Sequence, residues 1–310
     1  MIELQDVVKK FGNFEAVKGI NLNVKKGEIL GLLGPNGAGK TTTMRMITGF
    51  FPQTSGQITI GGEDIFECSM NIRKKIGYLP EKNPLYYDMR VYEYIEYAAK
   101  LKKVNINKSK IDEIMEKTGL VEMRKRLIGN LSKGYKQRTG IAQALINDPE
   151  ILILDEPTSG LDPRQIVEIR ELIRSFAVEH TVILSTHILP EVHVTCDRVV
   201  IMNKGKIISE DTPENMLLSF KKGYGSDIVI EANGSQDKII NIIQKFSKSF
   251  NVAEIDGNFK IKLDKPEKDI RAEINKALIN DKIDVLEIYS ENPQLEEVFI
   301  TLVKKEEEQV

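Results

Sequence analysis

One eight-residue segment constrains this sequence more than any other feature. It reads Gly34-Pro35-Asn36-Gly37-Ala38-Gly39-Lys40-Thr41. An apolar strand, predicted over 29–33, precedes it, and a helical run over 42–48 follows it. Its glycines let successive backbone N–H groups turn inward around a phosphate, and a helix N-terminus adds partial positive charge. The spacing G-x-x-x-x-G-K-[ST] in this context predicts a phosphate-binding loop rather than a chance glycine-rich turn.

The polar residues that end this loop predict how it holds a nucleotide. We expect Lys40 to bridge the β- and γ-phosphates of ATP and the Thr41 hydroxyl to bind Mg²⁺. The next residue, Thr42, is placed to hydrogen-bond the α-phosphate. ATP and Mg²⁺ are therefore the cofactors that this segment predicts.

A second chemical feature lies at the end of an apolar strand predicted over 151–154. There Asp155 and Glu156 stand side by side. We expect Asp155 to hold Mg²⁺, directly or through water, and Glu156 to polarise the water that attacks the γ-phosphate. The alternative is a strand that leaves the core with two solvated acids. The phosphate-binding loop upstream favours the catalytic interpretation, because phosphoryl transfer depends on positioning and charge neutralisation.

Length, charge and hydropathy narrow the class of protein. A chain of 310 residues fits one large domain and a small one. The net charge of -2, with no strongly basic block, does not suggest a broad nucleic-acid-binding surface. Its apolar runs are far shorter than the ~20 residues that span a bilayer, and the chain opens on a strand-like stretch rather than a signal peptide. We therefore expect no transmembrane segment.

Hydrophobic periodicity divides the chain into two regions. Residues 1–220 alternate apolar strands with amphipathic helices, as in an α/β domain, with a helical subdomain inserted at about 82–147. Residues 221–310 carry the order β-α-β-β-α-β, which predicts a small α+β, ferredoxin-like domain. Its predicted elements are strand 227–232, helix 236–250, strands 252–255 and 259–263, helix 267–280 and strand 285–290. A last helix is expected over 294–304, with a frayed charged tail over 304–308.

Three further motifs follow the loop in a fixed order. The run Leu131-Ser132-Lys133-Gly134-Tyr135 precedes the acidic pair, Asp162 follows that pair, and His187 comes after another predicted strand. Over residues 1–220 the chain resembles the nucleotide-binding domain of ABC transporters, with Walker A, signature, Walker B, D-loop and switch histidine in that family's order. The resemblance implies a P-loop NTPase fold of the ABC type and an ATPase activity coupled to transport.

The same resemblance implies how ATP is held. Two nucleotide-binding domains, identical or different, are expected to close head to tail around two ATP molecules. Each ATP would lie between one subunit's loop and its partner's signature, with trans contacts from Ser132, Lys133, Gly134, Tyr135 and Asp162. Phe11 matches the aromatic residue that stacks on adenine, and Val17 is expected in the same pocket. His187 matches the histidine that contacts the γ-phosphate and orients water, so the expected catalytic residues are Lys40, Glu156 and His187.

Three residues depart from the family pattern. In the signature, which usually reads LSGGQ, Lys133 replaces a glycine and Tyr135 replaces the glutamine. Lys133 points either to solvent or toward the partner's nucleotide. Glu81 stands where the family has glutamine, and its carboxylate is expected to be a Mg²⁺ ligand beside Thr41 and Asp155. Both motif variants are similar to those of the type-2 exporter branch, which moves drugs, polysaccharides, lipids or ions outward.

The resemblance also implies a partner. A separate transmembrane permease is expected to contact the aromatic-rich stretch 81–92, which otherwise is ordinary packing of the helical subdomain. The chain would then work as an exporter's motor, peripheral to the cytoplasmic face of the membrane and without nucleic acid. Two alternatives stay open: a soluble ABC ATPase acting on nucleic acid or ribosomes, and a non-hydrolytic nucleotide sensor. The C-terminal domain could stabilise the dimer, bind a regulator or cap the core.

Overall fold

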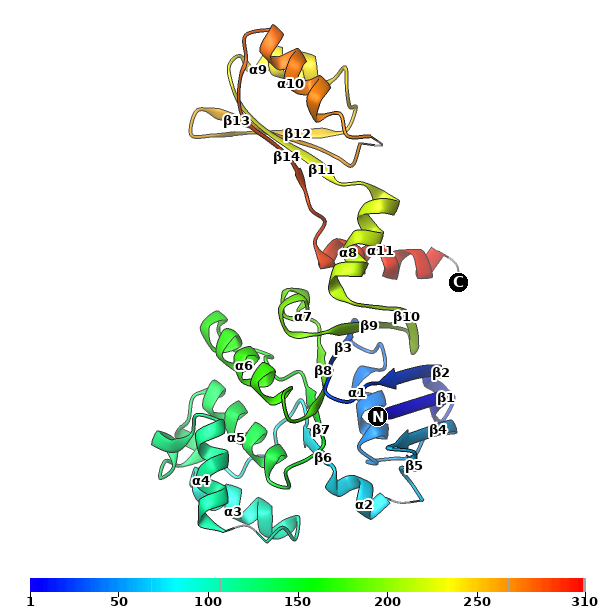
Figure 1. The fold of residues 1–310 in the computed structure, drawn as a ribbon, viewed down its shortest axis with the longest axis vertical. Coiled ribbons are helices and arrows are strands. Elements are labelled where there is room, and N and C mark those ends of the chain that lie inside the picture. Colours follow the sequence, from blue (N-terminus) through cyan, green and yellow to red (C-terminus); the bar gives the residue numbers. More distant parts are fainter. Residues whose placement is uncertain (68, 106, 267, 309–310) are drawn as a thin grey trace. The chain divides into compact units, whose positions relative to one another are not determined.

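The computed structural model describes residues 1–67, 69–105, 107–266 and 268–308 (Figure 1). Contacts divide the chain into a larger unit, Met1–Pro213 with Leu302–Val310, and a smaller unit, Glu214–Thr301. The boundary expected at residue 220 falls inside helix α8 (Pro213–Tyr224). Residues 309–310, the end of the expected second domain, lie outside the described part. Within the described ranges, we find no helix that combines the length and hydropathy needed to cross a bilayer.

A mainly parallel sheet forms the centre of the larger unit. Its described strands are β3 (Ile29–Leu33), β6 (Ile76–Leu79), β7 (Ile151–Asp155), β8 (Thr181–Thr186), β9 (Arg198–Asn203) and β10 (Lys206–Asp211). They lie in the order β10-β9-β3-β8-β7-β6, and β10 alone of these six runs antiparallel to its neighbour. Every residue of β3, β7 and β8 is buried, as expected for parallel strands covered on both faces.

An antiparallel sheet lies beside the central one. It consists of β1 (Ile2–Phe11), β2 (Phe14–Val24), β4 (Ser55–Ile60) and β5 (Glu63–Asp64), in the order β2-β1-β4-β5. Helix α1 (Lys40–Ile47) packs its apolar side chains Met44 and Ile47 into one cluster with residues of both sheets. Because this burial fixes α1, it also fixes the loop that leads into the helix.

The helical insertion has an apolar core of its own. It contains α3 (Val91–Leu101), α4 (Lys108–Lys117), the short 3₁₀ turns η1 (Val121–Met123) and η2 (Ile128–Asn130), and α5 (Lys133–Leu145). Side chains from all three α-helices form one buried cluster with side chains from the segments before and between them, among them Leu85, Leu120 and Leu131. The remaining helices described in the larger unit are α2 (Ser69–Lys74), α6 (Pro163–Phe176) and α7 (Leu189–Thr195).

The smaller unit confirms the predicted β-α-β-β-α-β order. Its elements are β11 (Asp227–Asn233), α9 (Gln236–Ile243), β12 (Phe250–Ile255), β13 (Asn258–Leu263), α10 (Arg271–Asn280) and β14 (Asp284–Glu291). The four strands are antiparallel in the order β12-β13-β11-β14. The helix expected over 236–250 is too long, because Ser247 and Ser249 form a hydrogen-bonded turn that leads into β12. Residue 267, where the next helix was expected to begin, lies outside the described residues.

The expectation of a frayed charged tail over 304–308 is wrong. Helix α11 (Leu295–Glu308) continues through it. One of its acidic side chains, Glu306, accepts a hydrogen bond from Asn203 at the end of β9. A specific long-range contact therefore holds a segment whose composition alone suggested a solvated tail.

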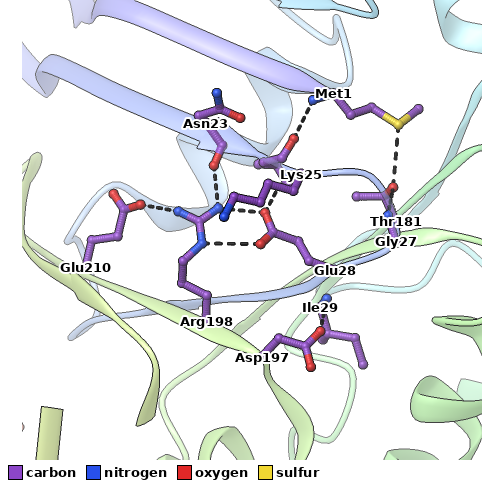
Figure 2. Close-up of polar contacts among 11 residues, drawn as sticks. Met1, Asn23, Lys25, Gly27, Glu28, Ile29, Thr181, Asp197, Arg198 and Glu210 are labelled. Atoms are coloured by element: carbon purple, nitrogen blue, oxygen red, sulfur yellow. Dashed lines mark hydrogen bonds and ion pairs between the residues drawn. The ribbon is translucent and has the colours of Figure 1, made fainter. Parts of the chain in front are cut away.

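A polar network lies at the edge of the central sheet where β3 and β9 begin and β10 ends (Figure 2). The Arg198 guanidinium at the start of β9 pairs with Glu28, at 2.6 Å, and with Glu210 of β10. Ile29 N donates to the Asp197 carboxylate at 2.8 Å. These contacts fix the strand ends opposite the phosphate loop, so β3, β9 and β10 keep one register.

Candidate active site

Glycines shape the loop between β3 and α1. Gly39 is the N-cap of α1 with φ 106°, and Gly37 has φ 80°; both values lie in the left-handed region that favours glycine. A Cβ atom on Gly34 would lie 2.4 Å from the carbonyl oxygen of Met202, so no larger residue fits there. The loop is therefore positioned by its own backbone and by close packing against the end of β9.

Lys40 is buried inside this loop. Its Nζ donates to the carbonyl oxygens of Gly34, at 2.6 Å, and Pro35, at 3.3 Å, and lies 4.0 Å from the Glu156 carboxylate. Burial lowers the pKa of Lys40, and the nearby Glu156 and Asp155 carboxylates oppose this shift. The loop thus holds a desolvated ammonium group that is bonded to two backbone carbonyl oxygens and lies at ion-pair distance from one carboxylate.

Asp155 connects the loop to the end of β7. Its Oδ1 accepts hydrogen bonds from Thr41 Oγ1, at 3.1 Å, and from Ser185 Oγ, at 2.6 Å. Its Oδ2 is buried without a hydrogen-bond partner among the described residues. A buried carboxylate oxygen beside a hydroxyl is a suitable pair of hard ligands for Mg²⁺. The described residues contain no group of three or more His, Cys, Asp or Glu side chains that could hold a metal by themselves.

Glu156 is held in a strained conformation beside it. Its φ of 51° is unfavourable for a non-glycine residue. The backbone N–H of Glu156 donates to both the hydroxyl and the carbonyl oxygen of Ser185, at 3.0 and 3.2 Å. Its side chain is directed toward His187, whose Nδ1 lies 2.8 Å from Glu156 Oε2. Ser185 therefore positions both carboxylates, which the sequence interpretation did not anticipate.

These groups surround a cavity of about 470 Å³. Its lining contains the second half of the phosphate loop and Glu81. It also contains two expected catalytic residues, Glu156 after β7 and His187 after β8. The lining residues are Phe14, Ala16, Pro35, Asn36, Gly37, Ala38, Gly39, Lys40, Thr41, Thr42, Glu81, Glu156, Ser159 and His187. The lining thus contains most of the residues for which the sequence predicted phosphate, metal and water contacts. Gly34 and Asp155 are absent from it, although Asp155 bonds the lining residue Thr41.

The residues expected around adenine lie differently. Phe11 and Val17 are absent from this lining, whereas Phe14 and Ala16 are present. Val17 is fully buried, and the Phe11 ring packs edge-on against Phe51 with centroids 5.5 Å apart. Phe11 and Phe14 are nevertheless direct cross-strand partners at the β1–β2 turn. Two exposed aromatic rings therefore flank the turn, and only one of them borders the cavity.

The signature residues border a second cavity of about 320 Å³. Ser132 is the N-cap of α5, where its Oγ accepts from Tyr135 N at 3.4 Å. Asp162 is the N-cap of α6. The lining residues are Ser132, Gly134, Tyr135, Arg138, Asp162, Arg164, Gln165, Glu168 and Ile169. None of these described residues borders the cavity of the phosphate loop.

Lys133 does not border this second cavity. Its side chain is exposed, and its Nζ lies 2.0 Å from the position that a Cβ on Gly160 would occupy. Gly160 has φ 67°, so glycine suits this turn on conformational grounds as well. The lysine that replaces a signature glycine thus covers the turn before Asp162 of its own chain.

The aromatic stretch after β6 presents two tyrosines to solvent. Tyr86 and Tyr87 are 53% and 55% exposed. The Tyr86 ring contacts Tyr94 and Tyr97 of α3, and Lys136 of α5 lies over the Tyr87 ring. The stretch therefore packs on the helical insertion and keeps an aromatic outer surface.

Comparison with known proteins agrees with this arrangement. The family model described as ABC transporter matches residues 17–159. The bacitracin transport ATP-binding protein BcrA of Bacillus licheniformis is 37% identical over 305 residues, which cover 98% of this chain and 97% of BcrA. The lantibiotic transport ATP-binding protein SrtF of Streptococcus pyogenes is 40% identical over 220 residues, 70% of this chain and 94% of SrtF.

This chain belongs to the ATP-binding subunits of ABC transporters. It binds and hydrolyses ATP as the motor subunit of an ABC exporter. Among solved structures, a dimeric post-hydrolysis state of the ATP-binding cassette MJ0796 bound to ADP and Pi is 27% identical, with a TM-score of 0.62. That match covers 68% of this ABC subunit and 98% of MJ0796. Because ATP hydrolysis is established, the non-hydrolytic sensor is no longer an alternative.

Proposed function

We propose that this ABC subunit closes head to tail with a second nucleotide-binding subunit, identical or homologous, around two ATP molecules. The observation that carries the proposal is the separation of the two cavities. Lys40, Glu156 and His187 border one cavity, whereas Ser132 and Asp162 border another. A site built from both sets therefore needs two chains, and the MJ0796 cassette in its ADP-bound state is a dimer.

Within the closed site, each step of ATP binding and hydrolysis is assigned to a group whose position suits it. Lys40 exchanges its two carbonyl partners for β- and γ-phosphate oxygens. Thr41, Asp155 and Glu81 would hold Mg²⁺, which when bound neutralises phosphate charge. Glu156 orients the water whose oxygen bonds to the γ-phosphorus as the bond to the β–γ bridging oxygen breaks. His187 contacts the γ-phosphate and keeps Glu156 aligned.

The trans contacts come from the partner's signature segment. Ser132 and Gly134 offer a hydroxyl and a helix N-terminus to the γ-phosphate, with Tyr135 and Asp162 bordering the same cavity. Lys133 is proposed to act on its own D-loop turn at Gly160, since its side chain lies there. Phe11 is proposed to stack on adenine, with Val17 packed behind the loop as support.

A transmembrane permease is the proposed partner. The exposed rings of Tyr86 and Tyr87, within the 81–92 stretch, supply a surface for it on the helical subdomain 82–147. BcrA and SrtF are named for transport of bacitracin and lantibiotics, which supports an antibiotic as cargo. The ferredoxin-like C-terminal domain, about 221–310, is proposed as an accessory domain of this exporter, at the cytoplasmic face of the membrane.

Replacement of Glu156 tests the proposed chemistry. Glu156→Gln removes the negative charge but keeps the shape, so Mg²⁺-dependent ATP hydrolysis should fall by about 10²–10⁴-fold, with ATP still bound. Glu150→Gln, at an exposed position just before the same strand, is the matched control and should keep wild-type turnover. Hydrolysis by Glu156→Gln at the wild-type rate would assign the water-orienting role to another group.

A further inference from the structure

The turn between β9 and β10 packs directly against the phosphate loop. Gly205 N donates to the carbonyl oxygen of Ala38 at 3.0 Å. The carbonyl oxygen of Met202 lies so close to Gly34 that a Cβ atom there would be 2.4 Å from it. The loop therefore contacts the last residues of β9 at Gly34 and the turn itself at Ala38. A displacement of the turn displaces the backbone N–H groups that face the phosphates.

The turn has little freedom of its own. Lys204 and Gly205 both have positive φ, 45° and 85°. A two-residue hairpin turn needs these values to match the twist of the strands that it joins. On its other side, Gly205 O accepts from Lys18 N at 2.8 Å, and a Cβ on Gly205 would lie 2.8 Å from Ala16 O. The turn is thus wedged between β2 and the loop, and Ala16 also borders the nucleotide cavity.

Asn203, which opens the turn, is held from the far end of the chain. It is 3% exposed, and its Nδ2 donates to Glu306 Oε2 at 2.7 Å. Glu306 lies in the part of α11 that belongs to the larger unit. A buried amide that loses its partner carries a desolvation cost, so removal of the Glu306 carboxylate favours a shifted turn.

We propose that Glu306 is a positioning residue for ATP: through Asn203 and the β9–β10 turn, it holds the phosphate loop in its nucleotide-binding conformation. The proposal rests on the assignment of the 34–41 loop as the nucleotide site. It gives the end of α11 an indirect influence on nucleotide affinity. The route consists of two hydrogen bonds, which Asn203 Nδ2 donates to Glu306 and Gly205 N donates to Ala38 O.

The test measures ADP binding to the full-length protein by titration calorimetry, so that hydrolysis does not complicate the result. Glu306→Ala should raise the Kd for ADP by about threefold or more, the scale of one lost hydrogen bond. Glu306→Gln keeps an acceptor and should restore wild-type affinity. Glu308→Ala, an exposed acid on the same helix, is the matched control and should not change the Kd.

A double-mutant cycle tests the route. If Glu306 acts through Asn203, then Glu306→Ala has no further effect on the Kd in an Asn203→Ala background. Three results would each overturn the proposal. The first is that Glu306→Ala binds ADP with the wild-type Kd, and the second is that Glu306→Ala and Glu308→Ala change the Kd equally. The third is that the effects of Glu306→Ala and Asn203→Ala on the free energy of ADP binding are additive. Lys40→Ala in the same assay tests the nucleotide site itself: if this variant binds ADP like wild type, the site assignment fails instead.

Discussion

His187 Nδ1 lies 2.8 Å from Glu156 Oε2, so the imidazole after β8 and the carboxylate after β7 form a pair. The pair depends on Ser185, which bonds the Glu156 backbone and the Asp155 carboxylate from the adjacent strand. One buried hydroxyl group thus sets the relative position of the proposed metal ligand and of the proposed water-orienting group.

Ser185→Ala should therefore damage hydrolysis more than binding. The variant leaves the Asp155 carboxylate and the strained Glu156 backbone without a shared donor and acceptor. We expect kcat to fall by about tenfold or more, while the KM for ATP changes by less than about threefold. Steady-state ATPase assays measure both values. Ser175→Ala, which removes a hydroxyl bonded only within α6 in the described contacts, is the control. Equal kcat values for both variants would contradict the role of Ser185.

Phe11 is predicted to carry base stacking, although Phe14 borders the cavity. Phe11→Ala should raise the Kd for ATP by about tenfold, and Phe11→Tyr should retain wild-type affinity, since each stacked base contributes about 1–3 kcal/mol. Phe14→Ala should have the smaller effect. Calorimetry with all three variants decides between the two rings. A larger loss for Phe14→Ala would transfer the stacking role to Phe14.

Lys102 gives the stability of the protein a distinct pH dependence. Its Nζ donates to Gln143 O at 2.9 Å at the end of α5, and burial lowers its pKa to about 8. The unfolded chain keeps the ordinary value of 10.5, so between these values it binds more protons than the folded chain. The free energy of unfolding contributed by Lys102 therefore rises as the pH increases from 8 to 10.5, and this gain is lost again as the pH falls from 10.5 to 8.

Urea unfolding of wild type and Lys102→Met at pH 7 to 10 measures this effect. The wild type should gain stability relative to the variant across this range, by up to about 3 kcal/mol. The matched control is Lys100→Met on the exposed face of α3, which should keep a constant difference from wild type. Parallel profiles for wild type and Lys102→Met would contradict the lowered pKa.

Local chemistry explains which features the sequence could predict. The phosphate loop depends on its own glycines and the next helix, so its motif was sufficient to place Lys40 and Thr41. Asp155 and Glu156 follow directly from the end of a strand with an apolar pattern. The pairing of β12 with β13 likewise follows from two predicted strands that are adjacent in the sequence.

Long-range contacts explain what the sequence could not predict. Ser185 bonds Asp155, which lies 30 positions away in the sequence. Its place two residues before His187 is the one local feature that distinguishes it from other strand residues. The Asn203–Glu306 contact joins residues 103 positions apart, which is why the charged tail was expected to fray. Phe14 was missed because a strand end can turn either ring of the Phe11–Phe14 pair toward the cavity.

ATP-dependent dimerisation tests the central claim most directly. In a Glu156→Gln background, light scattering with ATP should show a dimer. Adding Ser132→Asn keeps the N-cap of α5 and should keep the dimer, whereas Ser132→Asp keeps the cap but places a negative charge against the partner's γ-phosphate. The account predicts that the Asp variant binds ATP and stays monomeric. If the Ser132→Asp variant forms as much ATP-bound dimer as the Ser132→Asn variant, that result contradicts a site shared between Ser132 and the partner's phosphate loop.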